Sequence, residues 1–295
     1  MIRNIRLSSS ADIEVGLAGA PDRPVVMLPV AKKSVEGPEA DNLKLWGVDP
    51  DLGKHFVEGL ADAFQVLYFD YESYLFAHPV EQLTAERVVQ DLLHIADAMQ
   101  VKSFSYYGYS WLALAGLQLA IRTDRLDSLI MGGFPPYEGP YREMLIVTKR
   151  THEQALRNQQ EAETPAGPSD PLADPQDIDW DNIKVTIRPE ITKQFVTMYE
   201  SLADFDDRLI QQKLQHLPRL AFAGEHDTIV YGEPFGGVTV DIAGALKRNR
   251  TLLAELGWKV EIMAGSGMDH TKAMQPAAVL PLIKPWLMRH ANVEQ

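Results

Sequence analysis

The 295-residue chain contains no cysteine. The absence of thiols excludes a cysteine nucleophile, disulfides, thiolate zinc sites and iron–sulfur clusters, so any nucleophile must be oxygen or nitrogen. Basic residues are also scarce, since 28 lysines and arginines stand against 41 acidic residues and give a formal net charge of −13. Such a charge repels phosphate backbones and anionic lipids at long range. We therefore expect a small-molecule substrate, with neither nucleic acid nor a membrane as partner.

Long hydrophobic runs are missing too. The first ten residues include basic side chains but no apolar run long enough for a signal peptide, and no uncharged stretch of about 18 residues follows. We therefore expect a cytoplasmic protein; the sequence makes no prediction of its oligomeric state. With 45% hydrophobic and 23% charged residues, the composition is that of an ordinary globular protein with a packed core.

The first 134 residues alternate between short apolar segments and helical patterns. Strands are predicted over residues 2–8, 12–17, 24–30, 65–69, 103–107 and 128–131, and helices over 53–64, 84–99 and 111–123. Within 84–99, Val88, Leu92 and Ile95 recur on one helical face, and Thr84 is predicted to be the N-cap. This alternation predicts an α/β fold, with a mostly parallel central sheet flanked by helices.

The alternation stops at Phe134. Residues 135–216 are predicted to form an inserted helical cap, in which the proline-rich acidic stretch 163–175 is a mobile loop. Strands resume over 219–223 and 259–263, separated by one helix over about 240–256, and a last helix ends near Met288. The core thus comprises 1–134 and 217–295. Phe195, Met198 and Tyr199 lie at helical spacing in the cap and are interpreted as packing residues.

A serine lies at a predicted strand-to-helix junction. Residues 107–112 read Tyr-Gly-Tyr-Ser-Trp-Leu, with Ser110 at the turn. A serine in such a turn adopts an unfavourable backbone conformation that exposes its hydroxyl. The following helix supplies a backbone N–H and the positive end of its dipole, which favour a developing oxyanion. Serine is a poor nucleophile by itself, so a base and a group that orients the base are also needed.

A histidine and an aspartate follow two later strands. Asp227 ends the sequence Gly-Glu-His-Asp after the strand 219–223, and His270 ends Gly-Ser-Gly-Met-Asp-His after the strand 259–263. The carboxyl ends of parallel strands meet at one edge of a sheet, so these residues can meet Ser110. Glu225 and Asp269 are rivals for the acid, and we interpret them as turn and loop-capping residues. No metal-ligand spacing such as His-Glu-x-x-His occurs.

Together these segments resemble the α/β-hydrolase superfamily of serine hydrolases, which has the same chain order of serine, acid and histidine. The resemblance covers nearly the whole chain. It implies that Ser110 is the nucleophile, His270 the general base and Asp227 the carboxylate that orients it, with no cofactor. It also places the oxyanion-hole N–H groups on Trp111 and Ala31, with Val30 the nearest alternative to Ala31, and assigns substrate-binding side chains to Val30 and Tyr109.

Two positions depart from the superfamily pattern. The elbow Gly-x-Ser-x-Gly has Leu112 as its fifth residue, and the loop after the strand 24–30 has no His-Gly. The resemblance implies hydrolysis of a small, uncharged, largely apolar ester through an acyl-enzyme. The same fold and residues also resemble cyanohydrin lyases and carbon–carbon bond hydrolases, and an acyltransferase is a further alternative. The two departures favour another, a ligand-binding or receptor protein with slow turnover. Fold alone does not separate these functions.

Overall fold

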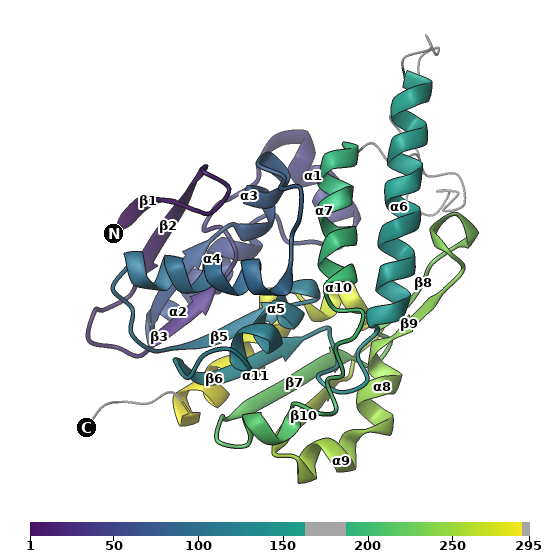
Figure 1. Ribbon diagram of the computed structural model, residues 1–295. Helices are drawn as coiled ribbons and strands as arrows, with labels where there is room; N and C mark the ends of the chain where they lie inside the picture. The colour runs from purple at the N-terminus through teal and green to yellow at the C-terminus, as the bar shows by residue number, and fades with distance from the viewer. Residues whose placement is uncertain (163–186, 291–295) are drawn as a thin grey trace.

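An eight-stranded sheet forms the centre of the computed structural model, which describes residues 1–162 and 187–290 (Figure 1). The strand order is β1-β2-β4-β3-β5-β6-β7-β10. The strands are β1 (Ile2–Arg6), β2 (Asp12–Ala18), β3 (Val25–Leu28), β4 (Gln65–Phe69), β5 (Phe104–Tyr109), β6 (Leu126–Gly132), β7 (Arg219–Gly224) and β10 (Trp258–Met263). From β4 to β10 all neighbours are parallel, and only β1 and β2 are antiparallel to theirs. The predicted α/β architecture is confirmed.

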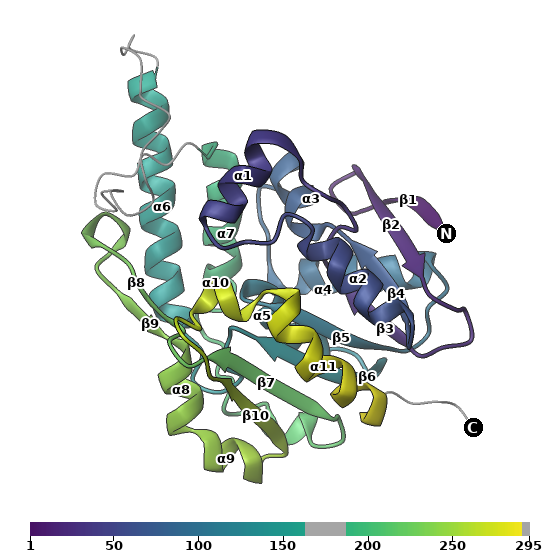
Figure 2. The same cartoon turned by 180° about the vertical axis from the view of Figure 1, so that it is seen from behind.

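Helices cover both faces of this sheet (Figures 1 and 2). One face packs against α2 (Leu52–Ala61) and α11 (Pro276–His290), and the other against α4 (Ala85–Ala98), α5 (Trp111–Ala120), α8 (Ile242–Arg248) and α9 (Arg250–Glu255). Alternation along β5 sends Tyr106 into the α4 side and Tyr107 into the α2 side. Both faces are therefore apolar, which explains the continuous hydrophobic strands in the sequence.

Helix α4 illustrates how the sequence specifies these elements. Thr84 is its N-cap, and the threonine side chain accepts a hydrogen bond of 3.2 Å from the Arg87 N–H, as predicted. Val88, Leu92 and Ile95 are fully buried against the sheet. Complete burial of such a side chain contributes about 1.5–3 kcal/mol, so the apolar face fixes the position of the helix.

A long segment is inserted between β6 and β7. It contains α6 (Tyr141–Ala162), α7 (Pro189–Glu200) and the short 3₁₀ helix η2 (Gln211–Leu214). In both views α6 and α7 lie side by side and rise from the edge of the sheet at which β5, β6 and β7 end (Figures 1 and 2). We call residues 133–218 the inserted segment. The stretch predicted to be a mobile loop, 163–175, lies outside the described residues.

Some elements differ from the sequence prediction. The single helix predicted over 240–256 is wrong, because the chain there forms the end of a hairpin followed by two short helices. Asp241 ends the hairpin and caps α8 by accepting a hydrogen bond of 2.8 Å from the Gly244 N–H. Elements that the sequence analysis missed are α1 (Gly37–Leu45), α3 (Tyr71–Ala77), β8 (Thr228–Val230), η3 (Glu233–Phe235), β9 (Thr239–Asp241) and α10 (His270–Ala273).

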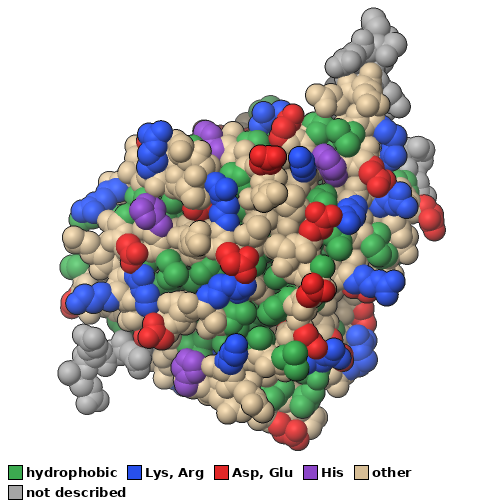
Figure 3. Space-filling view, viewed as in Figure 1, with side chains coloured by type: hydrophobic (Ala, Val, Ile, Leu, Met, Phe, Trp, Pro, Cys, Tyr) green, Lys and Arg blue, Asp and Glu red, His purple; other side chains and the backbone are tan. Residues whose placement is uncertain are grey.

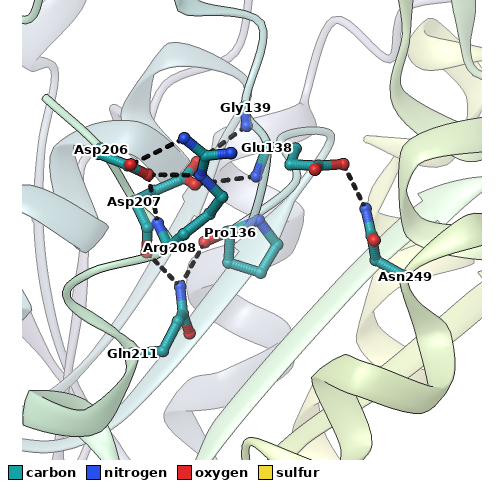
Figure 4. Close-up of polar contacts among 8 residues, drawn as sticks. All are labelled: Pro136, Glu138, Gly139, Asp206, Asp207, Arg208, Gln211 and Asn249. Carbon is teal, nitrogen blue, oxygen red and sulfur yellow. Dashed lines mark hydrogen bonds and ion pairs between the residues drawn. The ribbon is translucent and has the colours of Figure 1, made fainter.

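A polar cluster joins the two ends of the inserted segment (Figure 4). Asp207 is only 2% exposed, and its carboxylate accepts hydrogen bonds from the N–H groups of Glu138 at 2.9 Å and Gly139 at 2.8 Å. Gln211 donates to the carbonyl oxygens of Pro136 and Asp207, both at 2.8 Å. Desolvation raises the pKa of Asp207, while the two N–H groups oppose that shift. These five residues, the hinge cluster, fix where the inserted segment leaves the sheet.

The outer surface carries charges of both signs. Acidic and basic side chains alternate over the face shown in Figure 3 without a single-sign patch covering it. Within the described ranges, no helix has the length and apolarity needed to cross a lipid bilayer.

Candidate active site

Ser110 lies in the turn between β5 and α5. Its φ of 55° is a left-handed conformation that a non-glycine residue rarely adopts. Two backbone hydrogen bonds hold the turn, from the Ser110 N–H to the Gly132 carbonyl at 2.8 Å and from the Ala113 N–H to the Ser110 carbonyl at 2.9 Å. Stored strain of this kind is typical of functional sites.

Gly108 allows this turn to close. A Cβ atom on Gly108 would lie 2.3 Å from the carbonyl oxygen of Leu112, where α5 passes back over β5. A side chain at Gly108 would therefore push the helix away from the strand. The superfamily pattern expects a further glycine at the position of Leu112, whereas here Leu112 packs in the core and is 8% exposed.

Asp227 and His270 meet at the ends of β7 and β10, which are adjacent and parallel. Asp227 Oδ1 lies 2.9 Å from His270 Nδ1. Asp227 is fully buried, whereas the His270 side chain is 22% exposed. A carboxylate accepts a hydrogen bond from a protonated Nδ1, and in that tautomer of the neutral ring Nε2 keeps a free lone pair. The second carboxylate oxygen, Oδ2, has no hydrogen-bond partner among the described residues, so His270 is the partner of this buried group.

The two loops that carry these residues are tied together. Glu225 accepts a hydrogen bond of 2.8 Å from the Gly265 N–H, and the His226 N–H donates to the Met268 carbonyl at 3.0 Å. Asp269 is the N-cap of α10 and accepts from the Lys272 N–H at 2.8 Å. The interpretation of Glu225 and Asp269 as turn and capping residues is therefore confirmed.

Gly133 and Tyr109 surround the histidine ring. The Tyr109 hydroxyl donates to the His270 carbonyl at 2.8 Å, and the two rings lie 5.0 Å apart. Gly133 has a φ of +63°, and a Cβ there would lie 2.7 Å from Tyr109 Cζ and 2.8 Å from His270 Cε1. No side chain fits at Gly133 unless the histidine ring moves.

Ser110 and His270 line the same cavity, which has a volume of about 240 Å³. The cavity extends from the edge of the sheet into the space between α6 and α7. Hydrophobic and aromatic side chains form most of its wall, among them Trp111 and Phe134 at the base. A concave apolar pocket that contains a few convergent polar groups is the usual form of a small-molecule site.

The expected oxyanion donors lie in two different places. Trp111 is the first residue of α5 and lines the cavity, and its N–H has no hydrogen-bond partner within the described part of the chain. Ala31 lines a separate depression beside Lys33 and Asp70. The Val30 N–H already donates to the Leu28 carbonyl at 2.8 Å, which leaves it unavailable to a substrate. A second oxyanion donor on Ala31 stays a prediction.

Neither Val30 nor Tyr109 is among the residues that line this cavity. Alternation along β5 places Tyr109 on the same side of the sheet as Tyr107. The centroid of the Tyr109 ring lies 6.1 Å from that of Phe222. Tyr109 therefore contacts His270 without being one of the residues that line the cavity.

Most of the cavity wall was not predicted from the sequence. Phe195 and Tyr199, interpreted as packing residues, do pack against the core and also line the cavity, whereas Met198 is 1% exposed and packs in the core without lining it. The hairpin residues Ile229 and Tyr231 also line it. A signal for Gly133 was present, because a Gly-Gly pair directly follows a predicted strand.

No protein-family model matches the chain, and no curated protein matches it. Several solved structures match it over nearly its full length. A thermophilic esterase from Thermogutta terrifontis gives a TM-score of 0.56 at 17% identity, covering 99% of this chain and 100% of that one. An alpha/beta hydrolase from Sphaerobacter thermophilus gives 0.50 at 16%, covering 98% and 100%. An epoxide hydrolase from Vigna radiata gives 0.54 at 12%, covering 98% of each chain. At identities this low, the structural likeness shows the fold alone, and this fold supports more than one reaction.

Proposed function

We propose that this chain, which has the α/β-hydrolase fold, is a serine hydrolase that cleaves an uncharged, largely apolar ester through an acyl-enzyme. One observation carries the proposal. Ser110, in a strained turn at the start of a helix, shares an apolar cavity with a histidine whose Nδ1 contacts a buried carboxylate. A nucleophile, a base and a group that orients the base are the three parts that acyl transfer by serine requires.

In the proposed first stage, His270 Nε2 takes the proton of the Ser110 hydroxyl while Oγ attacks the ester carbonyl carbon. The imidazolium that forms is stabilised by Asp227, whose buried carboxylate lies 2.9 Å from Nδ1. The same proton then passes to the departing alkoxide oxygen as the ester C–O bond breaks. In the second stage, His270 deprotonates a water molecule that attacks the acyl carbon, and Ser110 leaves with that proton.

The tetrahedral oxyanion would be bound by the Trp111 N–H at the N-terminus of α5, where the helix dipole adds to the stabilisation. Removal of one oxyanion-hole donor typically lowers kcat by about 10²–10³-fold, so the second donor decides whether turnover is fast or slow. We propose Ala31 for that role, which would require its N–H to face the cavity once a substrate is bound. The inserted segment acts in this proposal as the cap that shields the acyl-enzyme.

A fluorophosphonate probe followed by peptide mass mapping tests the nucleophile, and hydrolysis of p-nitrophenyl butyrate tests the activity. We expect one label, on Ser110, and a loss of about 10⁴–10⁶ in kcat for Ser110→Ala. Ser266→Ala is the matched control, because Ser266 is exposed in the loop that precedes His270. It should keep both label and turnover. Label on another residue, or turnover that survives Ser110→Ala, would rule out the proposed mechanism.

A further inference from the structure

We infer that the cavity between α6 and α7 binds one unbranched hydrocarbon chain of the ester substrate along its length and thereby selects substrates by chain length. This inference rests on the proposed function and adds a substrate class to it. The chain could belong to either side of the ester, since both place the same hydrocarbon in the same space.

Two facing rows of side chains form the long walls. On α6 the row is Met144, Thr148 and Thr151, and on α7 it is Ile191, Phe195 and Tyr199. Steps of three and four residues keep each row on one face of its helix. From Met144 to Thr151 the rise is about 10 Å at 1.5 Å per residue. The two rows therefore run along the axes of α6 and α7, the two helices that lie side by side in Figure 1, as an extended chain would.

The threonines that line the cavity are less polar toward a ligand than free hydroxyl groups would be. The hydroxyl of Thr148 donates to the Met144 carbonyl at 2.8 Å, and that of Thr151 donates to the Val147 carbonyl at 2.8 Å. Thr192, which also lines the cavity, donates to the Pro189 carbonyl at 3.0 Å. Thr192 Oγ1 also lies 2.9 Å from His152 Nδ1 on α6. Each of these threonine hydroxyls therefore already has a hydrogen-bond partner within the protein.

Charge is absent from the walls as well. Among the described residues that line the cavity, none is a carboxylate, a lysine or an arginine, and His270 is the only histidine. An ionised group on the substrate chain would lose its hydration there without gaining a partner of opposite charge from a carboxylate, lysine or arginine, which is strongly unfavourable. A hydrocarbon has no such loss.

Aromatic rings limit the width of the cavity. Phe195 packs edge-on against Trp111 at 5.5 Å and against Phe76 at 6.0 Å between ring centroids, and all three residues line the cavity. Ile229 and Tyr231 of the hairpin belong to the same wall. Ile187, which precedes α7, also lines the cavity and is 41% exposed. A space walled by these rings and by the two helical rows, with Ser110 and His270 in its lining, suits a single chain.

A series of straight-chain p-nitrophenyl esters from acetate to hexadecanoate, together with straight-chain alkyl acetates, measures the length dependence. Each methylene that enters the cavity should raise kcat/KM about threefold to fourfold, given about 0.8 kcal/mol per buried methylene. The rise should stop once the chain passes Thr151. A rise in kcat/KM with chain length among the p-nitrophenyl esters places the hydrocarbon chain on the acyl side of the ester. A rise among the alkyl acetates places it on the alcohol side.

Two substitutions in the row on α6 test how far along the cavity the hydrocarbon chain extends. Thr151→Phe should block the cavity near its outer end, and Thr148→Phe should block it one turn nearer the serine. We expect both to move the preferred chain length down, and Thr148→Phe to move it further. Glu153→Phe is the matched control, because Glu153 is exposed on the opposite face of α6, and it should leave the profile of the wild type unchanged.

Thermal unfolding of each variant separates a blocked cavity from a damaged fold. If either phenylalanine variant fails to fold, Thr151→Leu and inhibition of the wild type by straight-chain alcohols of increasing length measure the same dependence. A flat profile in both ester series, or equal effects of Thr148→Phe and Glu153→Phe, would overturn the inference while leaving Ser110 as the labelled nucleophile. A protein without Ser110 labelling and without turnover would instead refute the proposed function, and the inference would fall with it.

Discussion

The edge of the sheet and the inserted segment form opposite halves of one cavity, and they are built differently. At the sheet edge, backbone hydrogen bonds and the hydrogen bond between His270 and the buried Asp227 hold three polar residues in place. In the inserted segment, apolar side chains from two helices form the wall, and the hinge cluster fixes only its base. From this difference we expect reactivity to depend on the sheet edge, and substrate selection to depend on the half whose side chains can change without disturbing the sheet.

The largest loss in kcat is expected when the acid at the sheet edge is altered. Asp227→Asn should lower kcat by about 10⁴-fold, because an amide at that position no longer holds the histidine tautomer that leaves Nε2 free. Asp269→Asn is the control, since Asp269 precedes His270 but caps α10, and asparagine is also a good N-cap. Steady-state kinetics on p-nitrophenyl butyrate measure both. Equal losses in the two variants would contradict the roles assigned here.

Gly133 tests the rigidity of the same edge. Gly133→Ala should lower kcat about 10²-fold, because the added Cβ would collide with Tyr109 and His270 and a shift of about 1 Å in a reacting group has that effect. Gly37→Ala provides the control, because Gly37 also has a positive φ, +68°, but nothing lies within 4 Å of its added Cβ. Both variants should lose stability from backbone strain, and only Gly133→Ala should lose turnover.

The hinge cluster gives the corresponding test of the inserted segment. Asp207→Ala leaves the N–H groups of Glu138 and Gly139 without their acceptor, so the free energy of unfolding should fall by about 1–3 kcal/mol. KM should rise more than kcat falls. Asp206→Ala, which removes only an exposed pair with Arg208, should change neither. A kcat loss as large as that of Asp227→Asn would remove the distinction between the two halves.

The pH dependence of that stability has a defined sign. Because desolvation raises the pKa of Asp207 in the folded state, the native protein binds more protons than the unfolded chain above the usual aspartate pKa. The contribution of this carboxylate to stability should therefore fall as pH rises through that window. Urea unfolding of wild type and Asp207→Ala at about pH 4 and about pH 7 measures the change, with the larger difference between them expected at the lower pH.

The smallest effect is expected for Tyr109→Phe. The substitution removes the hydrogen bond to the His270 carbonyl but keeps the ring, so kcat should fall about threefold to tenfold with little change in KM. Tyr107→Phe is the control, because the Tyr107 hydroxyl is buried and has no hydrogen-bond partner in the described part of the protein. If KM changed and kcat did not, Tyr109 would act on the substrate and not through the histidine.

The sequence predicted the sheet well because its signals are local. The apolar run at 25–28 and the amphipathic pattern ending at Met99 each depend on neighbours within a few residues, and the structure places a strand and a helix there. The prediction of one helix over 240–256 was wrong for two reasons. Asp241 and Asn249 interrupt it as local caps, and the hairpin before it depends on pairing across a loop that no periodicity reveals.

What the sequence alone determined is the order of elements along the chain and the positions of a serine, an acid and a histidine directly after strands. Those features follow from residue type, spacing and the parallel direction of the strands. Only the tertiary structure decided that Tyr109 is not among the residues that line the cavity, that Phe195 and Tyr199 line it, and that a side chain at Gly133 would collide with its neighbours. Each of these features depends on atoms that are distant in sequence. The packing of several helices decides which side chains become neighbours, and the sequence of a single helix does not.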